Sequence, residues 1–180
     1  SSMVPTAGVY LRARVDRFLE IADIVPAAGE PFDEVGDFTR AELTASWFTT
    51  LGPSGRGFVA GGAGSTLDAR PLSPYNFSLG GPFKLGALVP GALTGPKYLQ
   101  VTTGYLHQFG QLPSLIGGPM FFGGWLESGS AFEDVRDASW TNNISTGVVL
   151  ESILGPIFGA VSLDVDGGWR YYVAIGRLFR

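Results

Sequence analysis

The stretch that decides the fold is VYLRARVD, residues 9–16, in which apolar and polar side chains alternate. Val, Leu, Ala and Val occupy the odd positions, and charged residues occupy positions 12, 14 and 16. Successive side chains of a β-strand point to opposite faces, so a period of two indicates a strand with one apolar face. The stretch RAELTASW, residues 40–47, repeats the alternation and predicts a second strand.

Six further segments show this period, some of them weakly. We expect strands at about residues 55–67, 97–110, 119–129, 142–153, 156–165 and 169–179. Asp166-Gly167-Gly168 is a strong hairpin signal between the last two. Short turns alternate with longer loops, the longest covering about residues 66–96. The pattern predicts a single all-β domain over residues 1–180, an antiparallel up-and-down barrel of eight strands.

The composition is hydrophobic but poor in charge. Hydrophobic residues make up 45% of the chain and charged residues 16%, whereas a typical soluble domain is about 25% charged. Because there is no Cys, disulfides and thiolate metal sites are excluded. The net charge of −4 gives no electrostatic support for a nucleic-acid partner. No uninterrupted apolar run is long enough to predict a transmembrane helix.

The apolar face of the strands has two possible environments. In a soluble lipocalin-like barrel it lines the interior and binds an apolar ligand, whereas in an outer-membrane barrel it meets lipid. The polar face of the last four strands is mostly Gly, Ser and Ala, which suits a crowded lumen better than a solvated surface. Aromatic residues near the predicted strand ends are typical of membrane-interface belts: Phe18, Trp47, Phe48, Phe132, Trp140, Trp169 and Phe179. These features favour the membrane barrel and leave the soluble barrel as the alternative.

Five stretches in the second half of the chain have a characteristic order and spacing. They read LGGPFKLG (79–86), GPKYLQVTTGYLHQF (95–109), GPMFFGGWLESG (118–129), LGPIFG (154–159) and YVAIGRLF (172–179). Together they resemble the carboxy-terminal part of an Omp85-superfamily barrel, the bacterial surface antigen (D15) domain. Within that superfamily the resemblance is closest to the barrel of patatin-like outer-membrane proteins, the type Vd autotransporters. It covers a little over half the chain, and the first three predicted strands match in pattern only.

The resemblance implies a non-enzymatic barrel of the bacterial outer membrane that serves as an anchor, a pore, or a translocation or assembly barrel. Its implied partners are outer-membrane lipid and the barrel-assembly machinery, which would read Gly176 and Phe179 as an assembly signal. Lys84 corresponds to the basic residue that the family carries in a loop folded into the lumen. The Gly-aromatic pair that follows it in the family is absent here. Gly104 and Leu106 stand where family members often carry lumen-facing Glu and Arg.

The residues that could act in catalysis or metal binding have simpler structural interpretations. Asp166-Gly167-Gly168 matches a motif of patatin-like lipases, but it lies in a predicted turn, and Ser54 lacks the spacing of a nucleophile elbow. His107 is the single histidine, which excludes a His-rich metal site. Six charged residues on the polar faces predict a lumenal network instead: Arg12, Arg14, Glu127, Glu151, Asp164 and Arg170. We expect no catalytic site, cofactor or metal.

The strand count leaves open how the barrel is completed. Eight strands can close alone, but side chains then fill the interior and leave no room for the loop at residues 66–96. In the family, such a loop occupies a barrel of sixteen strands. The chain is therefore a truncated half, a small self-closed barrel, or one of two copies that together complete sixteen strands. Because lipid does not tolerate unpaired strand edges, the homodimer is a reasonable hypothesis.

Overall fold

The computed structural model describes residue 5 and residues 7–19, 37–67, 75–153 and 155–175. Eight long strands form one antiparallel sheet in the order β1-β2-β3-β6-β7-β8-β9-β10, so the predicted eight-stranded meander is confirmed. Their bounds are β1 (Gly8–Phe18), β2 (Phe38–Leu51), β3 (Gly55–Thr66), β6 (Lys97–Gln111), β7 (Gly117–Phe132), β8 (Thr141–Ser152), β9 (Gly155–Asp164) and β10 (Trp169–Ile175).

Two short strands lie outside this sheet. β4 (Phe77–Leu79) and β5 (Leu93–Gly95) pair with each other inside the long loop between β3 and β6. Three residues are too few to show a period, so the sequence did not predict them. A short 3-10 turn, Val135–Asp137, lies between β7 and β8. No helix in the described part of the chain is long and apolar enough to span a membrane.

The β9–β10 connection is the tight hairpin that the sequence predicts. Both Gly167 and Gly168 have φ near +110°, a region that L side chains rarely adopt. The Gly167 N–H donates to the Asp164 carbonyl at 3.1 Å, and the Asp164 N–H donates to the Gly168 carbonyl at 3.0 Å. Turn geometry therefore accounts for the Asp-Gly-Gly motif.

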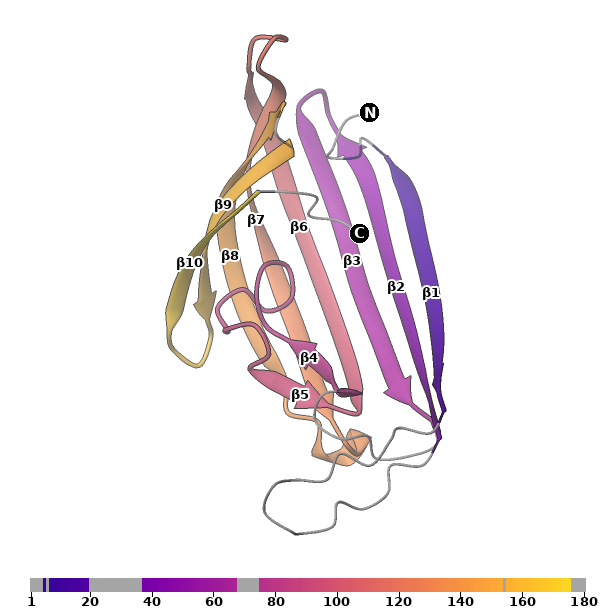
Figure 1. Ribbon diagram of the computed structural model, residues 1–180. Coiled ribbons are helices and arrows are strands. Elements are labelled where there is room, and N and C mark those ends of the chain that lie inside the picture. Colours follow the sequence, from indigo (N-terminus) through magenta and orange to yellow (C-terminus); the bar gives the residue numbers. More distant parts are fainter. Residues whose placement is uncertain (1–4, 6, 20–36, 68–74, 154, 176–180) are drawn as a thin grey trace, which may run out of the picture.

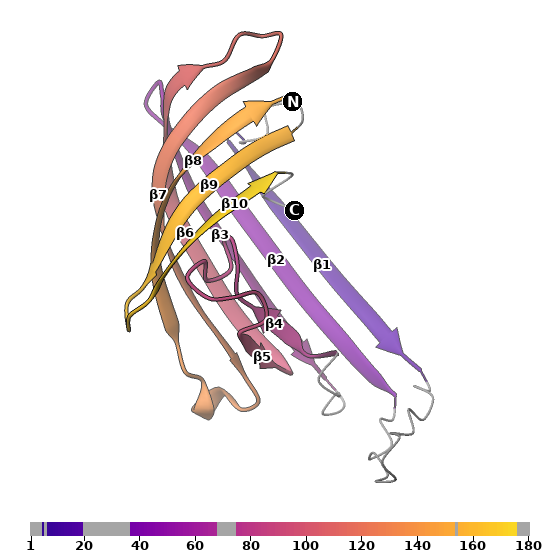
Figure 2. The ribbon, with the colours of Figure 1, turned by 60° about the vertical axis from the view of Figure 1, so that its left-hand side comes forward.

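The sheet is strongly curved, so that it has one concave and one convex face (Figures 1 and 2). Along β6, Leu99, Val101 and Tyr105 are exposed on the convex side, whereas Gln100 and Thr102 are buried on the concave side. Because paired residues in neighbouring strands share a face, the same alternation extends across the whole sheet. The predicted apolar convex face is thus confirmed, whereas the concave face is mixed: polar and small residues alternate there with large side chains such as Phe58, Phe121 and Trp125.

The predicted closure into a barrel is not seen in the described part of the chain, where β1 and β10 remain the edges of an open sheet. Residues 75–96, which we call the inward segment, lie against the concave face (Figure 2). A closed eight-stranded barrel has room for little more than its own inward side chains. The inward segment therefore occupies space that a closed eight-stranded barrel would not leave.

Two apolar clusters fill the space between the sheet and the inward segment. The first is Phe48, Phe58, Leu106, Phe121, Trp125, Val149, Phe158 and Ala160, and the second is Phe77, Leu79, Leu85 and Tyr98. Phe48 is 3% exposed in the first cluster, so its expected place in an outward aromatic belt is wrong. Trp47, Trp140 and Trp169 are exposed, as such a belt requires.

Substituting Gly104 by Ala should destabilise the sheet, because a Cβ there would lie 2.5 Å from the Trp125 Cβ and 2.7 Å from the Phe58 ring. Overpacking of this kind costs about 1–3 kcal/mol. Gly124 is a matched control on the convex face, where a Cβ would meet only the Ser145 carbonyl at 3.4 Å. We expect the urea midpoint of the refolded protein to fall for Gly104→Ala and to change little for Gly124→Ala. Equal midpoints would contradict this packing.

Candidate functional site on the concave face

The inward segment enters the concave face through a tight turn over residues 80–86. The Gly80 N–H donates to the Lys84 carbonyl at 2.7 Å, and the Lys84 N–H donates to the Gly81 carbonyl at 3.0 Å. Phe83 and Leu85 take left-handed backbone conformations, with φ of 56° and 71°. Such conformations cost roughly 1–2 kcal/mol each in residues other than Gly. In return, both side chains pack into the apolar clusters under the turn.

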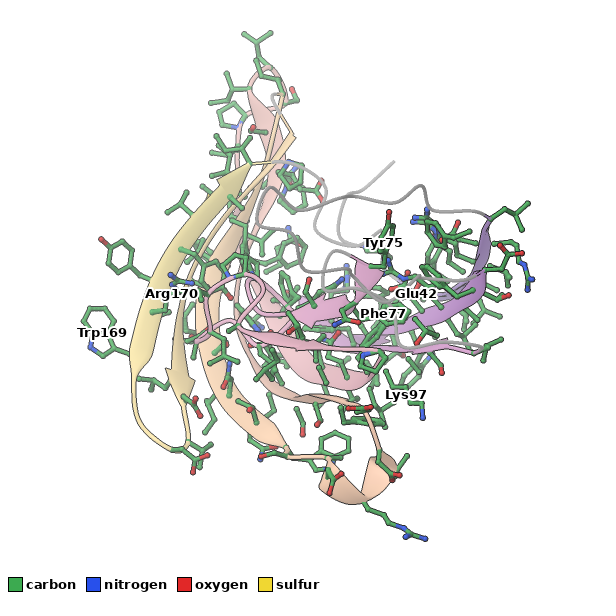
Figure 3. The ribbon with its side chains drawn as sticks, turned by 60° about the horizontal axis from the view of Figure 1, so that its bottom comes forward. Glu42, Tyr75, Phe77, Lys97, Trp169 and Arg170 are labelled. Carbon is green, nitrogen blue, oxygen red and sulfur yellow. The ribbon has the colours of Figure 1, made fainter. Side chains whose placement is uncertain are left out.

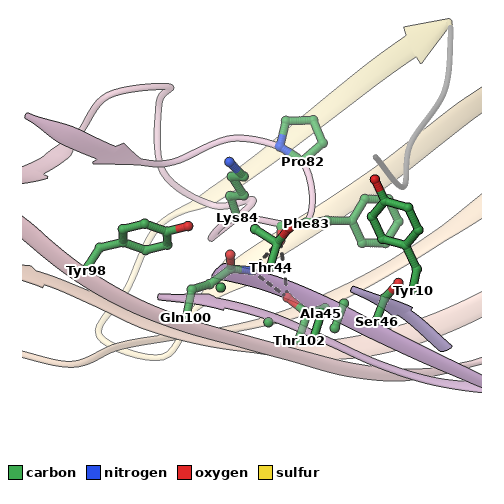
Figure 4. Close-up of a pocket in the computed structure, with 13 residues that line it drawn as sticks. Tyr10, Thr44, Ala45, Ser46, Pro82, Phe83, Lys84, Tyr98, Gln100 and Thr102 are labelled. Atoms are coloured by element: carbon green, nitrogen blue, oxygen red, sulfur yellow. Dashed lines mark hydrogen bonds between the residues drawn. The ribbon is translucent and has the colours of Figure 1, made fainter. Parts of the chain in front are cut away.

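Phe83 is anchored through both its ring and its backbone. The ring stacks on Trp125 and Phe158, with centroid separations of 4.9 and 4.8 Å. The carbonyl accepts hydrogen bonds from Gln100 Nε2 at 2.6 Å and Thr102 Oγ1 at 3.2 Å, two inward-facing side chains of β6 (Figure 4). Ring packing and hydrogen bonding thus fix the same residue of the turn.

Glu127 holds the next part of the segment. Its side chain is 1% exposed, and Oε2 accepts from the Gly86 N–H at 2.9 Å and from Ser145 Oγ at 3.0 Å. The hydroxyls of Ser145 and Ser162 are 2.6 Å apart, and those of Ser162 and Tyr172 are 3.4 Å apart. One polar chain therefore runs from the inward segment across β7, β8, β9 and β10.

Two more contacts secure the segment beyond Gly86. Asn143, with its amide oxygen oriented toward the segment, accepts from the Ala87 N–H at 3.0 Å. Arg170 Nη1 donates to the Leu88 carbonyl at 3.1 Å. A Cβ at Gly86 would collide with the Ser162 hydroxyl, so only Gly fits at this close approach.

The acidic residues of the predicted network all lie on the concave side but do not form one cluster. Glu127 and Asp164 lie on either side of Asn143 in the strand register, whereas Glu151 lies at the opposite end of β8. Glu127 contacts the inward segment through Gly86. Among the three acids, Glu127 is thus the one that we assign to holding the segment.

The basic residues of that network are divided between the two edges. Arg12 and Arg14 lie on β1, and Arg14 Nε forms an ion pair with Asp16 at 2.8 Å. Arg170 lies on β10, at the other edge, and contacts the inward segment instead. Lys84 is exposed at the turn, and no carboxylate of the described residues lies within ion-pair distance of it. Gly176 and Phe179 lie outside the described residues.

A small cavity separates the turn from the β1 side of the sheet. Its volume is about 120 Å³, and Lys84 and Tyr10 stand on opposite sides of it (Figure 4). Gln100 and Thr102 form its floor together with small residues of β2 and β3. The turn therefore fills the concave face of β6 to β10 more completely than that of β1 to β3.

The serine hydroxyls beneath the segment and the single histidine have hydrogen-bond partners among the described residues. Ser145 and Ser162 bond to each other beneath the segment, while His107 is on the convex face, with Nδ1 3.2 Å from the Tyr105 hydroxyl. No group of three or more His, Asp and Glu side chains in the described part could hold a metal ion. No protein-family model matches the chain, and no curated protein matches it significantly.

Sequence reasoning missed most of the residues that hold the segment. Phe83 lies in a turn without periodicity, and the roles of Gln100, Asn143 and Ser145 depend on which backbone amides and carbonyls of the segment lie above them. One signal was available, since Glu127 is an isolated acid among Gly and Ser on an inward face. An isolated buried acid needs hydrogen-bond donors close by.

Replacing Glu127 by Ala should loosen the inward segment, because two buried hydrogen bonds to Oε2 are lost together, from the Gly86 N–H and from Ser145 Oγ. The Gly86 N–H keeps only the longer contact of 3.2 Å to the Asn143 amide oxygen. Each lost hydrogen bond contributes about 0.5–1.5 kcal/mol. We expect hydrogen exchange in peptides covering residues 80–90 to accelerate by roughly tenfold or more, since 1.4 kcal/mol corresponds to a factor of ten. Glu127→Gln keeps an acceptor oxygen and should give a smaller change.

Glu151→Ala is the matched control, because it removes a carboxylate from the same face at the far end of β8. Its exchange profile over residues 80–90 should equal that of the unmodified protein. If Glu127→Ala and Glu151→Ala behave alike, Glu127 does not hold the segment.

Proposed function

We propose that the chain forms the wall of a non-enzymatic bacterial outer-membrane barrel of the Omp85 type. Its convex face would meet lipid and its concave face the lumen. In this role it would act as a membrane anchor, a pore, or a translocation or assembly barrel. The observation that carries the proposal is the distribution of charge on the convex face, where charged side chains of the long strands are confined to strand ends.

The convex positions of all eight long strands form a continuous apolar surface. Each strand contributes at least one exposed large aliphatic residue: Leu11, Leu43, Val59, Val101, Leu126, Ile144, Leu163 and Val173. Soluble monomers rarely expose contiguous apolar patches beyond a few hundred Å². Contact with hydrocarbon removes the cost of exposing this surface to water.

The charged residues on the convex side mark one rim of this surface. Arg17 lies near the end of β1, and Lys97 begins β6. Figure 3 views the sheet from this rim and shows Lys97 pointing away from the concave side, where Glu42 and Phe77 lie. Basic residues at the edge of an apolar band are suited to the headgroup region of a membrane. Most of the long strands exceed the 9–11 residues that a tilted transmembrane strand needs.

The direction of curvature supports the membrane barrel over the lipocalin-like alternative. A lipocalin-like barrel turns its apolar faces inward around a ligand. Here the exposed aliphatic faces lie on the convex side, and the concave side carries buried polar groups such as Gln100, Glu127 and Asn143. The inward segment would occupy part of the lumen of the completed barrel, which favours a plugged or gated barrel over a wide open pore.

Tryptophan fluorescence can test which face meets lipid. We expect the protein to fold in detergent or vesicles. In vesicles, brominated lipid acyl chains should quench its tryptophan fluorescence. Trp47→Phe should remove part of this quenching, because Trp47 is half-exposed on the convex side. Trp125→Phe is the matched control, since Trp125 is buried on the concave side and should not contact lipid.

Two results would contradict the proposal. One is full folding in water without detergent or vesicles, with no quenching by brominated lipid. The other is quenching that survives Trp47→Phe and disappears in Trp125→Phe, because it would place lipid on the concave side.

A further inference from the structure

We propose that a second copy of this chain completes the barrel, with β10 of each copy pairing antiparallel with β1 of the other. Two identical seams would join sixteen strands around one lumen. The inference rests on the proposed membrane location, because unpaired backbone groups at a sheet edge are tolerated in water but not in hydrocarbon.

The inward segment prevents the chain from closing on itself. Phe83 lies over the rings of Trp125 and Phe158, and Arg170 of the edge strand β10 bonds to the segment at Leu88. Phe77 of the segment reaches the opposite half of the sheet, where the Arg40 guanidinium lies 4.0 Å from its ring centroid. Joining β1 to β10 within one chain would reduce the interior to a space for side chains alone. Self-closure would therefore expel the segment.

Neither edge strand carries the Lys, Pro or bulge that commonly protects an edge, although β1 has the charged residues Arg12, Arg14 and Asp16 on its inward face. The β1 sequence GVYLRARVDRF and the β10 sequence WRYYVAI contain neither Lys nor Pro. Their pairings with β2 and β9 run without a bulge. Natural proteins use Lys, Pro and bulges to discourage edge-to-edge pairing. Strands without them are suited to pair with another strand.

A second copy fits these edges by direction and by symmetry. The eight strands alternate in direction, so β1 and β10 run antiparallel to each other. A two-fold axis along the barrel therefore brings each β10 beside the partner's β1 as an antiparallel neighbour, and the ring closes with two equivalent seams. A barrel of sixteen strands encloses a lumen wide enough for inserted loops.

Face and charge together select one register for the seam. The outward residues of β10, such as Tyr171 and Val173, must lie opposite the outward residues of β1 to continue the apolar surface. The single acid of β1 is Asp16, which shares the concave face with Arg170, the one charged residue of described β10. Placing Arg170 opposite Asp16 of the partner subunit satisfies both conditions.

Neighbouring registers on the same face are less favourable. A shift of two residues one way brings Arg170 against Arg14 of the partner subunit, and like charges directly opposite destabilise a sheet. A shift the other way removes the charge pairing by opposing Arg170 to Phe18 of the partner subunit. In the favoured register, Val173 lies opposite Ala13 of the partner subunit on the lipid-facing side.

The chain contains no Cys, so the seam can be tested by cysteine crosslinking in vesicles or detergent. A chain carrying Ala13→Cys is mixed with one carrying Val173→Cys, cofolded and treated with a short bis-maleimide. We expect a covalent species of two chains that needs both variants. Ala13→Cys mixed with Ala174→Cys is the control, because these positions point to opposite faces and should not crosslink.

The double variant Ala13→Cys, Val173→Cys separates the two ways of closing the barrel. A covalent dimer from the double variant supports the seam, while an internally crosslinked monomer shows self-closure and overturns it. Native mass measurement of the unmodified folded protein should give two chains, and a folded particle of one chain overturns the proposal. Quenching by brominated lipid, read on the same samples, reports on the membrane location separately. A sample that is quenched but forms no dimer would therefore contradict the seam and not the membrane location.

Discussion

The packing of residues 75–96 against the concave face is the constraint on which the rest of the structure depends. The segment supplies the buried partners of the inward polar side chains, since Gln100 and Thr102 bind the Phe83 carbonyl and Glu127 binds the Gly86 N–H. Without the segment, Glu127 and the neighbouring aromatic cluster would be exposed on the concave face. The same packing keeps the edges apart, because an eight-stranded ring has no room for an inserted loop.

Small inward residues make this packing possible. A Cβ at Gly64 would lie 2.6 Å from the Phe77 ring, and one at Gly129 would lie 3.3 Å from a methyl of Leu79. The high glycine content and the low charge of the chain thus have connected causes. Glycines on the inner face admit the segment, and the outer face carries charge only at its rim, so few positions remain for charged residues.

The long strands could be predicted from the sequence because their period of two follows from pleat geometry and one-sided burial. Residues 9–16 and 97–110 show it most clearly, and both lie within observed strands. The site could not be predicted in the same way. Phe83 takes a left-handed conformation that its residue type disfavours, and β4 and β5 are too short to show a pattern. Both features arise from tertiary contacts that local propensity does not encode.

The central claim is that the convex face meets lipid while the concave face is covered by the inward segment. The most direct test is a spin-label scan of single cysteines along β6, residues 99–109, in lipid vesicles. We expect labels at odd positions to be accessible to oxygen and shielded from a water-soluble nickel reagent. Labels at even positions should be immobilised by the segment or accessible from the lumen. Odd positions that are open to the nickel reagent and closed to oxygen would contradict the account.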